Sequence, residues 1–461
     1  MITEVKKYYD GKSEEMIAEF GKSFYFDRRL FFADVRVSLA YCDALFQAGV
    51  LTRLESERIK NGLQAIVKRA EFDKNYFEEP AADNIHSFVE TRLLQLIGET
   101  GGKLNVGRSR NEQTATALRL WLREEIGEIS KHTRDLQTAL INAGERQKEA
   151  VLPAYANQQK AQPILWAHWC LAYFEMFARD RERLDEVWRR INVLPLGAGV
   201  LAGTSFEIDR EEIARELSFE GVAANSLDAV ADADFAIETV GACCLLMIHL
   251  SRLAEDLILY NSAEFDFIKL TDSSSIDSFL RPNKNLEILE LIRGKTSRVF
   301  GHQTALLSMM KSLPLGVHKD LQEIQETVFD TIDTVNSCLK IVQINLENIR
   351  LNEAKTKDAA AKQYLNASEL TDYLVQREIP SKIAQEAVGK IILYAVSKNK
   401  NLDELSLEEM RGFSEIIDED IFHALSLEQT LASKNQIGGT APERVFEALE
   451  SAKVSLEMEE N

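Results

Sequence analysis

The sequence predicts a mainly α-helical protein whose centre is a bundle of long helices. Proline is scarce, with 8 residues in 461, where average usage would give roughly 23. Because proline interrupts helix interiors, its scarcity favours long helices. Five stretches place apolar residues at helical spacing. No run of alternating apolar and polar residues stands out, so we expect few strands.

The long helices are expected at 111–149, 161–192, 227–260, 286–312 and 319–350. In the third stretch the apolar positions alternate steps of four and three: Ala236, Val240, Cys243, Met247, Leu250, Ala254 and Leu257. This spacing puts one apolar stripe along the helix. A helix of 30 residues is about 45 Å long. Helices of that length usually bury their stripes in a bundle, which is often shared between subunits.

Four breaks separate these helices: a glycine-rich stretch at 194–204, a polar loop at 271–285, a proline break at 312–316 and a loop at 436–443. Beyond about residue 359 the expected helices are short and polar. We therefore predict three domains: an N-terminal helical domain at 1–106, a central long-helix bundle at 107–358 and a small helical C-terminal domain at 359–461.

Composition excludes several classes of function. The net charge of −20 argues against nucleic acid as a partner, although a local cluster of Arg and Lys can still bind a small anion. The longest uncharged apolar-rich run, 239–251, is too short to span a membrane. The N-terminus is too polar for a signal peptide. Five cysteines without C-x-x-C spacing indicate buried thiols in a reducing compartment, so we expect a cytoplasmic protein.

Two polar segments have the composition of an anion site. The loop 271–285 combines four serines with Arg281, Lys284 and Asn285. It either stabilises an anion through hydroxyl and backbone donors or is a solvated linker. The second segment places Ser109, Arg110 and Asn111 at the start of a long helix. Free N–H groups favour a carboxylate there, but serine and asparagine are also ordinary N-caps.

Other candidates are weaker. The segment 152–163 is interpreted as a polar loop that offers Asn157, Gln159 and Gln162 as substrate amides. His86 lies one helical turn from Glu90, so it is either a structural, ion-paired histidine or a site residue. The histidines show no metal-binding spacing, and the sequence has no phosphate loop and no G-x-S-x-G nucleophile elbow.

Taken together, the separate segments resemble the argininosuccinate lyase family, a branch of the fumarase/aspartase superfamily. The segments occur in that family's order and at its spacing: GRSRNEQTATALRLW (107–121), LPLGAGVLAGT (194–204), NSLDAVADADFAIE (225–238), LELIRGKT (289–296), LPLGVHKDLQE (313–323) and ASKNQIGGTAPERV (432–445). The GGTAPE ending and ASELTDYLVQREIP (367–380) are typical of this branch and not of fumarase or aspartase. The resemblance runs from about residue 10 to 450.

This resemblance implies a fold, an assembly and a reaction. The fold is a three-domain, mainly helical lyase, and the assembly is a homotetramer whose active sites each use loops from three subunits. The reaction is cleavage of argininosuccinate to L-arginine and fumarate in arginine biosynthesis, with no metal and no organic cofactor. A base removes the proton beta to the leaving nitrogen, and an acid helps that nitrogen to leave.

The same resemblance assigns catalytic positions. Ser278 aligns with the family's proton-abstracting serine, and Asn283 replaces the lysine that stabilises the carbanion, so that Lys284 is the available substitute. Glu290 is the carboxylate that pairs with the family's histidine, and that histidine is Asn157 here. The family's Thr-His pair is therefore Ala156-Asn157. Since asparagine does not titrate near neutral pH, the family's relay is broken at this position.

The substrate-binding positions carried over are His86, Ser109, Arg110, Asn111, Gln159, Asn285, Gln322 and Gln325. Some of them, and some of their neighbours, depart from the family. Gln325 replaces a lysine and Val317 a tyrosine, both at the end that holds arginine. Glu112 replaces an aspartate, and Asn105-Val106 replaces a His-Thr pair.

Three hypotheses follow from these departures. The first is a divergent, working argininosuccinate lyase. The second is a carbon–nitrogen lyase for another N-succinyl adduct, because the fumarate side is kept and the arginine side is altered. The third is a catalytically impaired paralogue with a structural or regulatory role, since helix packing and not the site stabilises the fold.

Overall fold

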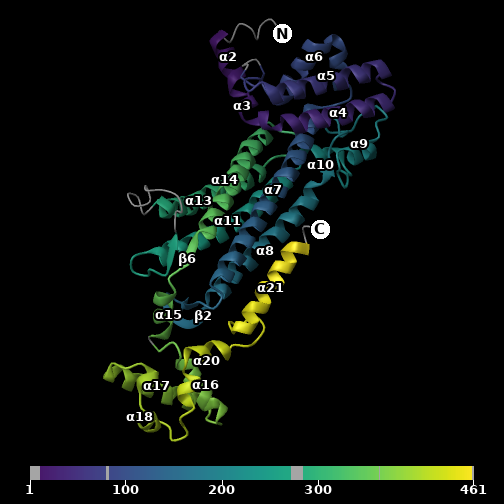
Figure 1. Ribbon diagram of the computed structural model, residues 1–461. Helices are drawn as coiled ribbons and strands as arrows, with labels where there is room; N and C mark the ends of the chain where they lie inside the picture. Colours follow the sequence, from purple (N-terminus) through teal and green to yellow (C-terminus); the bar gives the residue numbers. More distant parts are fainter. Residues whose placement is uncertain (1–10, 79–81, 271–283, 363, 459–461) are drawn as a thin grey trace. The chain divides into compact units, whose positions relative to one another are not determined.

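The computed structural model describes residues 11–78, 82–270, 284–362 and 364–458. Five long helices dominate it (Figure 1): α7 (Arg110–Arg146), α8 (Trp166–Ile191), α11 (Asp234–Asn261), α13 (Lys284–Met310) and α14 (Leu321–Glu347). The predicted all-helical class with a long-helix bundle is confirmed. No helix within the described ranges combines the length and the apolarity needed to cross a bilayer.

The third long helix begins later than the sequence pattern predicts. A short helix, α10 (Ser226–Ala231), precedes it, and Asn225 caps α10 by accepting hydrogen bonds from the N–H groups of Leu227 and Asp228. Asp232 then has extended backbone angles, φ −67° and ψ 126°, and its carboxylate accepts a hydrogen bond from the Asp234 N–H at 2.8 Å. Asp232 therefore ends one helix and starts the next.

The predicted polar loop at 152–163 is instead a β-hairpin, and this prediction was wrong. Strand β1 (Val151–Ala156) pairs antiparallel with β2 (Gln159–Leu165). The two turn residues, Asn157 and Gln158, have φ of 51° and 61°, as a tight two-residue hairpin turn requires. Because β2 runs to Leu165, α8 starts at Trp166 and not at 161.

The chain divides into two compact units, each assembled from separate stretches. Unit 1 comprises Met1–Ser130, Asp180–Met247 and Thr296–Asn336, and unit 2 comprises Lys131–Arg179, Ile248–Lys295 and Ser337–Asn461. Each long helix contributes residues to both units. The division into three domains at 106 and 358 stays a prediction.

Unit 1 contains the N-terminal helices α2 (Gly11–Phe20), α3 (Phe24–Asp27), α4 (Phe31–Gln47), α5 (Arg53–Phe72) and α6 (Ile85–Ile97), with 3-10 turns at Arg28–Leu30 and Gly98–Asn105. Thr52 and Asn84 begin α5 and α6 with reciprocal side-chain and backbone hydrogen bonds. The unit also holds α9 (Arg210–Glu216) and a short parallel pair, β3 (Val193–Leu194) with β4 (Gly221–Val222). These caps fix where α6 starts, and hence where His86 lies.

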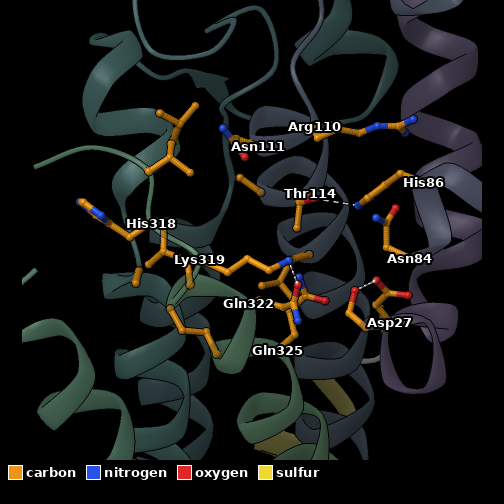
Figure 2. A pocket seen from close by; sticks show the side chains of 18 of the residues that line it. Asp27, Asn84, His86, Arg110, Asn111, Thr114, His318, Lys319, Gln322 and Gln325 are labelled. Atoms are coloured by element: carbon orange, nitrogen blue, oxygen red, sulfur yellow. Dashed lines mark hydrogen bonds between the residues drawn. The ribbon is translucent and has the colours of Figure 1, made fainter. Parts of the chain in front are cut away.

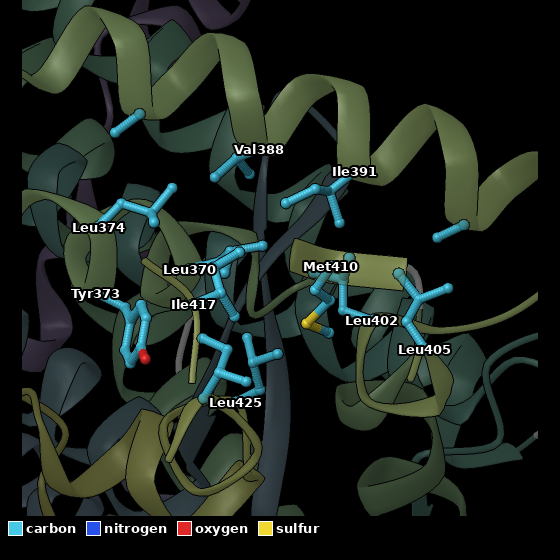
Figure 3. Packing of buried hydrophobic residues seen from close by; sticks show 13 residues of the cluster. Leu370, Tyr373, Leu374, Val388, Ile391, Leu402, Leu405, Met410, Ile417 and Leu425 are labelled. Atoms are coloured by element: carbon cyan, nitrogen blue, oxygen red, sulfur yellow. The ribbon is translucent and has the colours of Figure 1, made fainter. Parts of the chain in front are cut away.

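Unit 2 contains the hairpin, the antiparallel pair β5 (Ile268–Leu270) and β6 (Ile349–Leu351), and the C-terminal helices. These helices are α15 (Glu353–Ala361), α16 (Ala367–Gln376), α17 (Ser381–Lys398), α18 (Leu407–Arg411), α19 (Ile421–Ala424), α20 (Leu427–Ala432) and α21 (Pro442–Met458), with a 3-10 turn at Leu402–Glu404. Leu370 and Leu374 of α16 pack with Val388 and Ile391 of α17 in an apolar cluster (Figure 3).

We predict that Ile391→Ala destabilises the C-terminal helices by about 2–5 kcal/mol, because the substitution leaves a cavity in this cluster. The Ile391 side chain is 0% exposed, whereas Ile383 on the same helix is 56% exposed. Ile383→Ala is therefore the matched control and should cost less than about 1 kcal/mol. Amide hydrogen exchange of α16 and α17 measures both. Equal effects of the two variants would contradict this packing.

Candidate functional site

A cavity of about 290 Å³ lies in unit 1 and collects side chains from distant parts of the sequence (Figure 2). Its wall comes from α3, α6, the first turns of α7, the start of α11 and the first turn of α14 with the residues before it. The polar and charged lining residues are Ser23, Asp27, Asn84, His86, Arg110, Asn111, Thr114, Asp232, His318, Lys319, Gln322 and Gln325. The site thus combines hydroxyls, amides and a few charges.

The first turn of α7 presents Asn111 and Thr114 to the cavity, because residues three apart share a helix face. Ser109 begins this helix: its Oγ accepts a hydrogen bond from the Asn111 N–H at 3.2 Å. Ser109 is not among the residues that line the cavity. Its observed role is that of an N-cap, and its predicted contact with substrate stays a prediction.

Glu112 fixes the start of α7 against the glycine-rich segment 194–204. Its buried carboxylate accepts hydrogen bonds from the backbone N–H of Ser109 at 2.8 Å and of Gly199 at 2.7 Å. Burial raises the pKa of Glu112, although these backbone donors oppose the shift. Gly199 has φ +62°, and a Cβ atom there would lie 2.3 Å from the Gly203 oxygen. Only glycine fits this position.

Both ring nitrogens of His86 are within hydrogen-bond distance of a partner. Its Nδ1 lies 2.7 Å from Asp34 Oδ1 on α4, and its Nε2 lies 2.8 Å from Thr114 Oγ1. Gln113 Nε2 donates to the same Asp34 oxygen at 2.6 Å. Despite complete burial, which opposes ionisation, His86, Arg108 and these hydrogen bonds hold the pKa of Asp34 below its ordinary value. Asp34 is therefore an ionised partner for the imidazole.

Of the two alternatives that the sequence left open for His86, an ion pair with Glu90 is not what the structure shows, because the carboxylate beside His86 is Asp34. Glu90 instead forms an ion pair with Arg110 and accepts a hydrogen bond from Asn105 Nδ2. Figure 2 shows the Arg110 side chain extending away from Asn111. The Arg110 guanidinium is thus engaged by a carboxylate of its own chain, which lowers its capacity to bind an external anion.

The wall that includes the start of α14 is partly polar and partly apolar. Lys319 Nζ donates to Gln322 Oε1 and, at 3.4 Å, to the Gly21 carbonyl. Gln325 is 5% exposed, and its Oε1 has no hydrogen-bond partner among the described residues. Val317 and Ile324 complete this wall. A ligand with an N–H group would satisfy Gln325.

Sequence reasoning missed several lining residues, of which Ser23, Asp27 and Thr114 matter most. The Ser23 hydroxyl donates to Asp27 Oδ2 at 2.7 Å, and the Ile85 N–H donates to Asp27 Oδ1 at 2.9 Å. Burial raises the pKa of Asp27. No local signal marks Ser23 or Asp27. Thr114 follows Asn111 by one helical turn, and that spacing is a signal that could have identified it.

The cavity brings together five of the predicted site residues: His86, Arg110, Asn111, Gln322 and Gln325. The other predicted residues are not among those that line it.

Asn157 and Gln159 belong to the hairpin in unit 2. Glu290 is exposed on α13, and its Oε1 lies 3.7 Å from Arg293. Ser278 lies outside the described residues, as do the side chains of Lys284 and Asn285. The described part of the chain contains no cluster of three or more His, Cys, Asp or Glu that would hold a metal ion.

Comparison with known proteins identifies the family. Residues 7–301 match the lyase family model, and residues 364–432 match the model of the argininosuccinate lyase C-terminal region. The argininosuccinate lyase of Geobacter sulfurreducens is 46% identical over 443 residues, which are 96% of each chain. That of Pelotomaculum thermopropionicum is 43% identical over 97% of each chain. The chain belongs to the argininosuccinate lyase family.

Solved structures agree with this assignment at the level of the fold. An EDDS lyase variant with bound fumarate superposes with a TM-score of 0.81 at 24% identity, covering 94% of this chain and 87% of that chain. The 3-carboxy-cis,cis-muconate lactonizing enzyme from Pseudomonas putida gives 0.74 at 17% identity, covering 93% and 96%. The sequence relatives thus confirm the predicted argininosuccinate lyase family, and these structures confirm the predicted lyase fold.

We predict that Gly199→Ala destabilises unit 1 by more than about 1 kcal/mol, because alanine is strained at positive φ and its Cβ would displace the Gly203 carbonyl. Gly221→Ala is the control, since nothing lies within 4 Å of the added Cβ. Urea unfolding followed by circular dichroism compares the two. If Gly199→Ala were as stable as Gly221→Ala, the steric restriction at Gly199 would be contradicted.

Proposed function

We propose that this protein is a carbon–nitrogen lyase that cleaves argininosuccinate to L-arginine and fumarate in arginine biosynthesis. The proposal rests on the family to which the chain belongs. Within the structure, one observation carries it: the cavity joins amide and hydroxyl donors at the start of α7 to Gln322 on α14. The substrate is an N-substituted succinate, and its carboxylates need such donors.

We propose that the start of α7 binds the part of the substrate that becomes fumarate. The amide of Asn111 lies beside the positive end of a helix, where an anion is favoured. Lys319 is bound to Gln322 and adds a positive charge to the opposite wall. These donors stabilise the carboxylate whose charge increases when the adjacent carbon loses its proton.

We further propose a homotetramer with shared active sites, located in the cytoplasm. Ser278 is the proposed base, with Lys284 and Asn285 beside it, and Asn157, Gln159 and Glu290 complete the site. The three last-named residues are described by the structure but do not line the cavity of their own chain. We propose that these residues reach the cavity of a neighbouring subunit, because the family resemblance implies active sites built from loops of three subunits.

A specific observation favours a second candidate, a lyase for another N-succinyl adduct. Gln325 is buried and uncharged, and its Oε1 lacks a partner among the described residues. Val317 and Ile324 add apolar surface on the same wall. A leaving amine with an N–H donor and an apolar body fits this wall better than one with a second carboxylate.

The first test mixes the purified protein with argininosuccinate and follows fumarate by ultraviolet absorbance and arginine by mass spectrometry. We expect both products in equal amounts. Asn111→Ala should lower kcat about 10²-fold, because a donor to the developing charge is lost. Asn61→Ala, an exposed asparagine on α5, is the matched control and should leave kcat unchanged.

Absence of both products from a folded wild-type sample would reject argininosuccinate as the substrate. A panel of N-succinyl amines with apolar bodies would then test the second candidate. Release of fumarate from one of them would identify the leaving group.

The altered Ala156-Asn157 pair generates a separate prediction. The double substitution Ala156→Thr, Asn157→His restores the family's pair, and one added general acid or base is typically worth 10²–10⁴ in rate. We expect kcat to rise by at least about 10-fold if this position limits the reaction. Ala156→Thr alone, which adds no titrating group, is the control. An unchanged kcat in the double variant would mean that the protein uses another proton-transfer group.

A further inference from the structure

Asp34, His86 and Thr114 form a chain of hydrogen bonds that ends in the cavity. The two links measure 2.7 Å, from Asp34 Oδ1 to His86 Nδ1, and 2.8 Å, from His86 Nε2 to Thr114 Oγ1. Asp34 is 0% exposed and His86 is 4% exposed. Thr114 is half-buried and lines the cavity beside Asn111 (Figure 2). A buried carboxylate and a buried imidazole are thus connected to one hydroxyl group that lines the cavity.

The acid end of this chain is held ionised. Gln113 donates a second hydrogen bond to Asp34, and Arg108 lies close enough to act on it electrostatically. A carboxylate in this position accepts a hydrogen bond from Nδ1–H of His86 and so fixes the orientation of the ring. The charged groups that face His86 from the surrounding helices are Asp27, Asp34, Glu90, Arg108 and Arg110.

The hydroxyl end has two states. When Nε2 carries no proton, the Thr114 O–H donates to it. When His86 is an imidazolium, its Nε2–H donates to Thr114 Oγ1, and the Thr114 O–H is released toward the cavity. The protonation of His86 therefore decides whether the cavity meets a hydroxyl donor or a hydroxyl acceptor.

We propose that Thr114 is a catalytic residue that delivers a proton to the leaving nitrogen, with His86 resupplying that proton and Asp34 positioning His86. This inference rests on the proposed function, because it assigns the acid of that elimination. As the C–N bond breaks, its electron pair goes to nitrogen. The nitrogen takes the Thr114 hydroxyl proton, and Thr114 takes the Nε2 proton of His86. Neutral His86 regains a proton from water.

The direction of transfer follows from the basicity of the two ends. Guanidino and alkylamino leaving groups are strong bases once the bond has broken, so they accept a proton from a hydroxyl readily when that hydroxyl is refilled at the same time. Asn157 does not titrate near neutral pH and cannot supply this proton. The cavity contains one further histidine, His318, whose Nε2 lies 2.9 Å from the Pro314 carbonyl. His86 is thus the histidine that is linked to a cavity hydroxyl.

The experiment compares Thr114→Val and Thr114→Ser in the full-length protein, with argininosuccinate as substrate. Valine keeps the shape and removes the proton, so kcat should fall by about 10²-fold or more, while KM changes much less. Serine restores a hydroxyl and should retain kcat within about 10-fold. Thr116→Val is the matched control, because Thr116 is on the same helix, outside the cavity, and donates only to the Glu112 carbonyl.

The pH profile separates proton transfer from a structural role. The relay predicts a wild-type kcat that falls at high pH, with an alkaline limb that disappears in Thr114→Val but persists in Thr114→Ser. A Thr114→Val enzyme with wild-type kcat and an unchanged alkaline limb would overturn the inference. Loss of kcat with the limb intact would also overturn it, since Thr114 would then act only in packing.

A second measurement keeps failure of the proposed function distinct. If the wild type releases no fumarate from argininosuccinate, the proposed function fails. Deuterium exchange at the C2 carbon of His86, measured by mass spectrometry across a range of pH, then tests the relay itself. Thr114→Val should alter the pH dependence of exchange at His86, and Thr116→Val should not. Identical exchange in the wild type and Thr114→Val would show that the relay does not form.

Discussion

The geometry of the site depends on the carboxylate of Glu112. It accepts two backbone N–H groups at once, one from the residue that caps α7 and one from the glycine-rich segment almost ninety positions later. This single acceptor fixes the register of the first turn of α7, so that Asn111 and Thr114 face the cavity while Gln113 faces Asp34. Without this contact, the first turn of α7 would be free to fray, as helix ends generally do.

Burial determines what the polar groups around this turn can do. Asp34, His86 and Gln113 are almost completely enclosed, and a buried polar group must find a partner or cost free energy. Their hydrogen bonds satisfy Asp34 Oδ1 and the two ring nitrogens of His86, with Thr114 as the last partner, whereas Asp34 Oδ2 has no hydrogen-bond partner among the described residues. At the start of α11, the buried Arg119 guanidinium forms an ion pair with Asp232. The polar interior therefore supports the cavity and also sets its electrostatics.

Periodicity was sufficient to predict the helical class and the five long helices, because each of them contains regularly spaced apolar residues that are buried. It failed at Asp232, where a side-chain cap interrupts the pattern, and at 151–165, where a positive-φ turn reverses the chain. Both events are decided by one or two residues, and an average over a helical window cannot resolve them.

The site was predictable only in part. Motif resemblance predicted five residues of the site that line the cavity: His86, Arg110, Asn111, Gln322 and Gln325. The partner of His86 was not predictable from spacing, because Asp34 lies 52 positions away on another helix. Glu90, at the right spacing, is occupied by Arg110. Sequence spacing thus indicates which residues could pair, and tertiary packing determines which of them do.

The hairpin turn at Asn157 and Gln158 has a consequence for how this family changes over time. Asparagine is among the few residues that adopt a left-handed backbone readily, so it occupies φ 51° with little strain. Exchanging another residue for asparagine at the tip of such a turn leaves folding almost untouched, even when it removes an ionisable group. Selection for stability therefore does not constrain the residue at this position. The residue there can change, and its chemical role with it, while the fold is kept.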